Sequence, residues 1–211
     1  MKIVKRVGVV LAIVAMLFFV IAWSLPPTFH VERSIVVAAA PEQIHPSVNR
    51  LQEWPKWIPW NVEKYPDMKL SFTGPEEGVG AKYAWTGTGT GNGNLELKTS
   101  DPAKGVAYDI LFEGDAKPNT GGITFTPEGT GTKVTWHMDG DLGWNPISRY
   151  FGLMIDSMLG PDFEAGLAKL KAKVEKEATA PMEPPPVEPA PMEPAQATPP
   201  AAGAPAGSAT P

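Results

Sequence analysis

The pattern that most constrains this fold is an apolar residue at every second position, repeated in short segments across the middle of the chain. Residues 132–139 are an example, because Val134, Trp136 and Met138 alternate with polar neighbours. Turn-forming stretches such as residues 74–78, Gly-Pro-Glu-Glu-Gly, separate the segments. Regular alternation between turns predicts an antiparallel meander with one buried face. The expected strands are residues 29–37, 68–73, 81–86, 93–100, 106–113, 121–127 and 132–139.

The apolar spacing changes to about 3.6 residues near the end of this region, which predicts an amphipathic helix. A break is expected at Gly160-Pro161, because proline disrupts a helix interior. The residues that carry the pattern are Phe151, Met154, Ile155, Met158, Phe163, Leu167, Leu170 and Val174. A short helix over residues 41–48 and one helical turn within residues 51–60 precede the meander. A curved sheet needs a second layer to bury its concave face. The sequence therefore predicts an α+β helix-grip fold, a curved antiparallel sheet wrapped on a long C-terminal helix.

The N-terminus carries a separate signal, an uncharged run over residues 7–25 that is long enough to cross a bilayer as a helix. Lys2, Lys5 and Arg6 precede it and should remain in the cytoplasm. We therefore expect a single-pass inner-membrane protein whose domain lies outside the cytoplasm. The alternative is a signal peptide cleaved near Ala22-Trp23-Ser24, although this run exceeds the usual length of such apolar regions.

The chain divides into an anchor over residues 1–25, a domain over residues 26–177 and a tail over residues 178–211. The tail consists largely of proline and alanine and has no Lys, Arg or aromatic residue, so we expect disorder with polyproline II character. It is either a solvated tail or a docking strip for a cell-envelope partner. The absence of cysteine excludes disulfides and thiolate metal sites. A net charge of −5 without a basic patch argues against nucleic-acid binding.

Residues 28–175 resemble the START/Bet v 1-like (SRPBCC) superfamily, in particular its polyketide cyclase/dehydrase-like branch. The resemblance rests on five segments in order: residues 30–35 leading into 40–43, residues 54–60 (Trp-Pro-Lys-Trp-Ile-Pro-Trp), residues 78–85, residues 131–136 and residues 162–171. It implies a cavity between sheet and helix that binds apolar or amphipathic small molecules. Members of the superfamily range from lipid carriers to cyclases, so the resemblance implies no particular chemistry.

The sequence gives little support for any catalytic residue. Cyclase-like chemistry needs an acid or base beside the ligand, but His137 is expected on the outer sheet face and His30 at a strand start. The glycines of residues 87–93 lack the helix and the Lys-Ser/Thr pair of a phosphate loop, which favours a hairpin loop. The short acidic pairs at 76–77 and 139/141 offer too few oxygens for a metal. We expect no catalytic residue, cofactor or metal, and cyclase-like activity remains a minor alternative.

Aromatic residues are the more informative group, and they either fill a core or line a ligand cavity. The residues assigned to the cavity are Trp57, Trp60, Tyr83, Trp85, Phe112, Phe125, Trp136, Met154, Met158 and Phe163. The predicted function is membrane-anchored binding of a hydrophobic or amphipathic, possibly lipid-derived, molecule. The alternative is a non-enzymatic interaction module of the cell envelope that uses the domain and the proline-rich tail.

Overall fold

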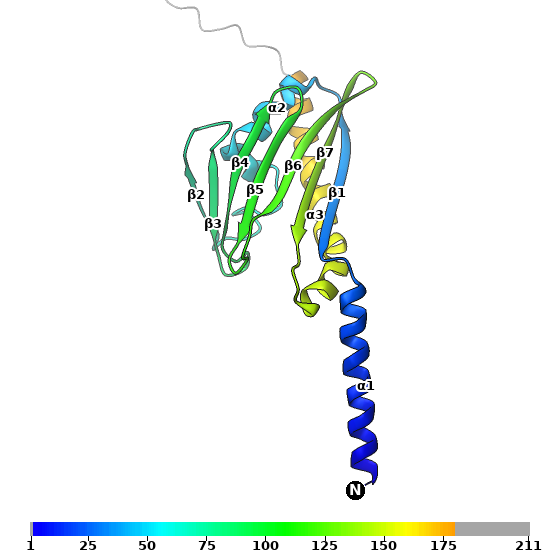
Figure 1. Cartoon of the computed structure of the whole chain (residues 1–211). Coiled ribbons are helices and arrows are strands. Elements are labelled where there is room, and N and C mark those ends of the chain that lie inside the picture. Colours follow the sequence, from blue (N-terminus) through cyan, green and yellow to red (C-terminus); the bar gives the residue numbers. More distant parts are fainter. Residues whose placement is uncertain (1, 180–211) are drawn as a thin grey trace, which may run out of the picture. The chain divides into compact units, whose positions relative to one another are not determined.

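The computed structural model describes residues 2–179, and its elements follow the expected order (Figure 1). The helices are α1 (Lys2–Ser24), α2 (Pro41–Asn49) and α3 (Pro146–Thr179), with a 3-10 helix, η1 (Leu51–Lys56), after α2. The strands are β1 (Thr28–Val37), β2 (Lys69–Thr73), β3 (Lys82–Thr86), β4 (Gly93–Asp101), β5 (Gly105–Phe112), β6 (Asn119–Glu128) and β7 (Gly131–Asp141).

All described strands form one antiparallel sheet in the order β1-β7-β6-β5-β4-β3-β2. Strands β2 to β7 each pair with their neighbour along the chain, as expected of a meander. The first strand, β1, pairs with the last, β7, which places β1 and β2 at the two edges. The predicted antiparallel sheet is confirmed.

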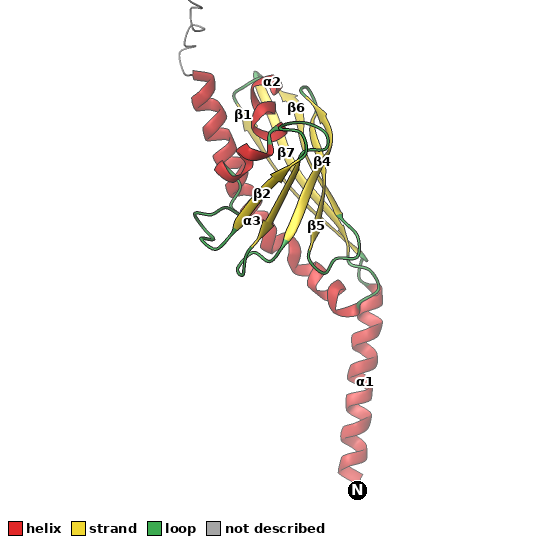
Figure 2. Ribbon diagram, turned by 90° about the vertical axis from the view of Figure 1, so that its left-hand side faces the viewer, coloured by secondary structure: helices red, strands yellow, loops and turns green. Residues whose placement is uncertain are grey.

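The core lies on one face of this sheet, as the alternation indicated. On β7 the side chains of Val134, Trp136 and Met138 are buried, whereas the residues between them are partly exposed. Figure 2 shows α3 passing along the sheet. Its second half contributes fully buried side chains to the same core, including Leu167 and Leu170. Burying each such leucine stabilises the fold by roughly 1.5–3 kcal/mol, so the predicted helix-grip arrangement is confirmed together with its physical basis.

Arg33 ties the edge strand β1 to α3. Its guanidinium donates to both carboxylate oxygens of Asp156, at 2.8 and 3.0 Å, and to Glu164 Oε1 at 2.8 Å. The side chain crosses the helix at Gly160, where an added Cβ would collide with the guanidinium. The hydrogen bond from Arg33 lowers the pKa of Asp156. This clamp holds the middle of α3 against the open edge of the sheet.

Two expectations for α3 were wrong. The helix continues through Pro161 instead of breaking there, although proline cannot donate to the carbonyl of Ser157 four residues earlier. The expected inward face was also misassigned, since Met154 and Met158 are 55% and 51% exposed while Ile155 is 7% exposed. Successive helical residues differ by about 100° in direction. The inward residues are Ile155 and Leu159, each one position after a methionine, so a rotation of one residue turns both methionines outward.

The apolar run forms α1, which by length and composition is the one helix among residues 2–179 that could cross a membrane. A signal sequence of this kind would meet the same criteria. The core contains no residue of α1, because its first member along the chain is Val31. The predictions for the proline-rich tail beyond residue 179 lie outside the described residues.

Candidate ligand cavity

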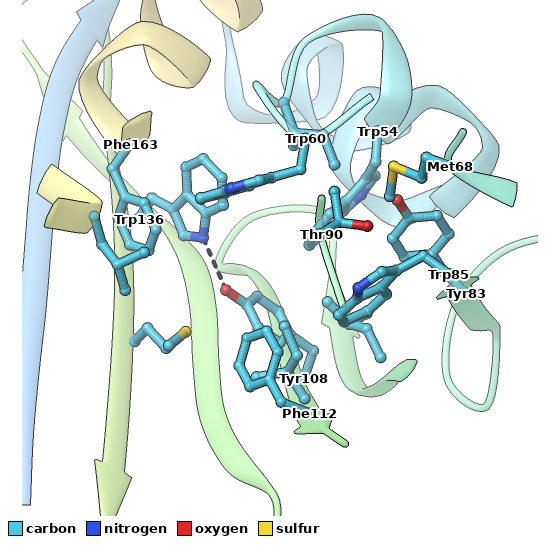
Figure 3. Close-up of a pocket in the computed structure, with 15 residues that line it drawn as sticks. Trp54, Trp60, Met68, Tyr83, Trp85, Thr90, Tyr108, Phe112, Trp136 and Phe163 are labelled. Atoms are coloured by element: carbon cyan, nitrogen blue, oxygen red, sulfur yellow. Dashed lines mark hydrogen bonds between the residues drawn. The ribbon is translucent and has the colours of Figure 1, made fainter. Parts of the chain in front are cut away.

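A cavity of about 140 Å³ lies between the sheet, the segment that follows α2, and α3 (Figure 3). Its walls are mainly aromatic, and none of the described residues that line it carries a charge. The lining residues are Trp54, Ile58, Trp60, Met68, Tyr83, Trp85, Thr90, Leu95, Tyr108, Ile110, Phe112, Trp136, Met138, Leu159 and Phe163. An apolar cavity of about 150 Å³ can hold a benzene-sized molecule.

Aromatic stacking between sheet and helix builds one wall. The rings of Trp136 on β7 and Phe163 on α3 are nearly parallel, with centroids 4.1 Å apart. Trp60 meets both rings edge-on, at 6.2 and 6.3 Å. The indole of Trp136 approaches α3 closely at Gly166, where an added Cβ would lie 2.8 Å from the ring. Such stacked and edge-on pairs add stability beyond simple burial.

Glycines on neighbouring strands leave room for the other rings. Tyr108 on β5 lies directly opposite Gly121 on β6, and a Cβ at Gly121 would come within 2.6 Å of the phenol. Trp85 on β3 is likewise paired with Gly93 on β4, where a Cβ would collide with the indole. The sheet therefore lets Tyr108 and Trp85 lie flat across the next strand.

Two phenol hydroxyls lie among the lining residues. The indole N–H of Trp136 donates to the Tyr108 hydroxyl at 2.8 Å, shown as the dashed line in Figure 3. Indole is a donor only, so this bond leaves the phenol's own proton available. The buried Tyr83 hydroxyl has no hydrogen-bond partner among the described residues.

Both phenols are protonated at neutral pH, as tyrosine ordinarily is. Burial raises the pKa of Tyr83 to about 12 and that of Tyr108 further above the usual tyrosine value. At neutral pH the residues that line the cavity therefore include two O–H donors and no ionised group. An unpaired buried hydroxyl costs about 1–3 kcal/mol, which a ligand acceptor would recover.

The glycine-rich segment forms the loop between β3 and β4, as the sequence indicated, and Thr90 from this loop lines the cavity. The loop is tied to the preceding segment because the Thr88 N–H donates to Asp67 Oδ2 at 2.6 Å. A Cβ at Gly89 would approach the Tyr65 ring to 3.2 Å. Glycine at this position permits the two loops to pack together beside the cavity.

Six of the ten residues assigned to the cavity from sequence lie around it: Trp60, Tyr83, Trp85, Phe112, Trp136 and Phe163. The other four do not. Trp57 is fully buried behind the wall, where it meets Trp136 edge-on and donates its indole N–H to the Ser47 carbonyl. Phe125 is buried opposite Val134, away from the lining residues. Met154 and Met158 lie on the exposed face of α3.

Sequence reasoning missed several lining residues that the same patterns could have identified. Tyr108 and Ile110 share a strand face with Phe112, and Met138 alternates with Trp136. Leu159 lies one helical turn after Ile155 and one before Phe163. Trp54 had no such signal, because the proline-rich segment that carries it has no regular period.

The three histidines lie elsewhere. His30 pairs with Asp139 at 2.7 Å, and His137 lies against Gly122 on the outer side of the sheet. His45 contacts the Ser100 hydroxyl at 2.9 Å, and burial lowers its pKa. Among residues 2–179, no cluster of His, Asp or Glu could hold a metal ion.

Comparison with known proteins gives one family match and several similar folds. The family model described as polyketide cyclase/dehydrase and lipid transport matches residues 28–175. No curated protein matches the chain.

The similar solved structures include the di-domain ARO/CYC StfQ from the steffimycin biosynthetic pathway, at 17% identity and a TM-score of 0.55; the alignment covers 72% of this chain and 52% of that chain. TTHA0849 from Thermus thermophilus is 17% identical, with a TM-score of 0.54 and 71% and 99% of the two chains covered. KanY (ms6282) is 14% identical, with a TM-score of 0.50 and coverage of 70% and 98%. Similarity at these identities shows the fold alone.

Proposed function

Because this chain belongs to the polyketide cyclase/dehydrase and lipid transport family, we propose that it binds an apolar small molecule in the cavity between sheet and α3. The observation that carries this proposal is the uncharged, aromatic lining. Such a surface favours apolar ligands through burial of apolar area, and small-molecule sites are usually concave and aromatic-lined. The proposed contacts are Trp60, Tyr83, Trp85, Phe112, Trp136 and Phe163, with Trp57 supporting the wall from behind.

The two tyrosine hydroxyls indicate which polar group the ligand should carry. Tyr83 has no partner among the described residues, and Tyr108 accepts a hydrogen bond while its own proton remains available. A ligand that supplies one acceptor oxygen, such as a ketone, ester or ether oxygen, would satisfy a donor that is otherwise buried and unpaired. The proposed ligand is therefore an apolar ring or short chain that carries a hydrogen-bond acceptor.

The proposed setting is a membrane. Residues 1–25 would be a retained anchor with its N-terminus in the cytoplasm, and residues 26–177 would be the binding domain on the other side. This proposal is supported by the length and apolar composition of α1 and by the positive residues that precede its uncharged run.

A matched pair of ligands tests the binding proposal. Acetophenone carries one acceptor oxygen, and α-methylstyrene is a molecule of similar size in which a CH2 group replaces that oxygen. We expect calorimetry to show that Tyr83→Phe weakens the binding of acetophenone by about 0.5–1.5 kcal/mol, the net value of one hydrogen bond. The same substitution should leave the binding of α-methylstyrene, which has no acceptor, unchanged.

Two outcomes would contradict the proposal at different points. If neither molecule binds at concentrations up to its solubility limit, the cavity is not a site for small apolar ligands. If Tyr83→Phe changes the affinity for both molecules equally or for neither, the cavity takes apolar molecules but the assigned acceptor preference is wrong.

A further inference from the structure

The first half of α3 carries an apolar stripe that faces away from the core. Ile147, Phe151, Met154 and Met158 follow one another at intervals of four, three and four residues, which places them on one helix face. They are between 49% and 69% exposed, and Trp144 just before the helix is 83% exposed. An apolar stripe of this length on a soluble surface normally marks an interaction site.

The same part of α3 contacts the C-terminal end of α1. The rings of Tyr150 and Phe18 are stacked with centroids 4.7 Å apart, and the Tyr150 hydroxyl donates to the Phe18 carbonyl at 3.0 Å. Arg149 reaches the carbonyls of Trp23 and Leu25 at 3.4 and 3.3 Å. The exposed stripe is therefore continuous with the apolar surface of α1.

These contacts determine how deep the first half of α3 would lie if α1 spans a bilayer. Phe18 precedes Leu25, the last residue of the uncharged run, by seven positions, or about 10 Å along a helix that rises 1.5 Å per residue. If α1 spans a bilayer, Phe18 lies closer to the bilayer centre than Leu25 does, and so does a residue that stacks on Phe18. Tyr150 and Trp144 are aromatic residues of the type that favours the membrane interface, whereas Arg149 is buried and donates to the backbone carbonyls at the end of α1.

A groove opens beside the stripe and leads towards the cavity. Phe151 and Met158 line it from α3, and the loops that follow β5 and β7 line its other sides. Phe112, Met138 and Leu159 belong to both the groove and the cavity. An apolar molecule that enters the groove would therefore meet the cavity directly behind these three side chains.

We propose that this stripe lies on the lipid surface next to α1, so that the groove opens towards the bilayer and apolar ligands pass between the membrane and the cavity. The proposal rests on the proposed function, because it takes α1 to be an anchor and the cavity to be a binding site. It identifies the partner of the stripe as lipid, since the stripe continues the surface of the one described helix apolar enough to lie in a membrane.

Site-directed spin labelling of the full chain in phospholipid vesicles tests the lipid contact. The chain has no cysteine, so single labels can be placed at Phe151→Cys and Met154→Cys on the stripe. Ile13→Cys in α1 is the lipid reference, and Lys169→Cys on the exposed side of the second half of α3 is the water reference. We expect the two stripe labels to be relaxed by oxygen, as at position 13, and protected from a water-soluble nickel reagent that reaches position 169.

The alternatives are distinguishable. If the label at position 13 lies in lipid but the stripe labels are open to nickel, the stripe does not contact lipid. Stripe labels protected from both reagents would mean that protein covers the stripe, which also contradicts the proposal. A label at position 13 that is itself open to nickel would refute the anchor and with it the lipid contact, whereas the acetophenone titration would still report on the cavity.

Ligand uptake tests the route. With bromobenzene supplied in vesicles, quenching of the cavity tryptophans should be slower in Phe151→Asp/Met154→Asp, by roughly tenfold if two carboxylates must approach the membrane interface. Lys169→Asp is the control, and acetophenone binding from water should be unchanged in both variants. Equal uptake rates in wild type and the double variant would show that the ligand does not enter across this stripe.

Discussion

At the scale of single residues, the two cavity phenols differ in whether their hydroxyl already has a protein partner. Tyr108→Phe leaves the indole N–H of Trp136 without an acceptor, so we expect a loss of about 1–3 kcal/mol in the free energy of unfolding. Tyr83→Phe removes a hydroxyl that has no partner among the described residues, so stability should be unchanged or slightly higher. Urea denaturation of the two variants measures both. An equal loss in Tyr83→Phe would mean that its hydroxyl is satisfied in the free protein.

Substitutions of two tryptophans distinguish a core position from a cavity position. Trp57 is fully buried and does not line the cavity, so Trp57→Ala should cost about 3–5 kcal/mol through lost burial and a new void. Trp85 borders the cavity, so Trp85→Ala should cost less stability while markedly changing affinity for acetophenone. Denaturant melts and calorimetry on both variants test this. Equal costs, with no change in binding, would identify the space beside Trp85 as ordinary core.

Sequence patterns gave a physical reason for a cavity position mainly where a regular period existed, and Trp60, in the irregular segment, was assigned without one. Tyr83, Trp85 and Trp136 could be assigned to the inner sheet face because alternate residues on a strand share a face. Trp54 and Trp57 lie in a proline-interrupted segment without a period, so nothing in the sequence indicated which of them would reach the cavity. The pairing of Trp136 with Tyr108 depends on strand register, which apolar alternation alone does not determine.

At the scale of secondary-structure elements, the Arg33 clamp makes the attachment of α3 to β1 sensitive to pH. The hydrogen bond from Arg33 lowers the pKa of Asp156 in the folded state. Its contribution to stability is therefore present above the ordinary aspartate value of about 3.9 and is lost as pH falls through the lowered folded value. The stability difference between wild type and Asp156→Asn should be constant near neutral pH and decrease below about pH 4. Denaturation measured across this range tests it, and a difference that does not depend on pH would contradict the assigned ion pair.

Element boundaries were easier to predict than element orientation. The meander strands were expected within a few residues of their observed limits, because turns and alternating apolar residues mark them. The face of α3 was not, since Phe151, Met154 and Met158 form a regular apolar stripe that a soluble-protein pattern assigns to the core. The contacts of Tyr150 and Arg149 with α1 provide a second apolar environment, and a helix pattern alone cannot distinguish the two.

At the scale of the whole molecule, the domain should fold without its first 25 residues. The hydrophobic core includes no side chain of α1, and the contacts of Arg149 and Tyr150 with α1 lie outside it. We expect residues 26–211 to give the circular dichroism of a folded α+β protein and a cooperative urea transition. Loss of both would show that the domain depends on α1 and that the proposed boundary is wrong.

The central claim is that this fold holds an apolar ligand among its tryptophans, and quenching by bromobenzene, whose ring matches the size of the cavity, tests it most directly. Trp54, Trp60, Trp85 and Trp136 all line the cavity, so bound bromine would contact them. We predict saturable quenching of tryptophan fluorescence that benzene reverses by competition. Quenching that rises linearly without saturation, or that benzene leaves unchanged, would contradict binding in the cavity.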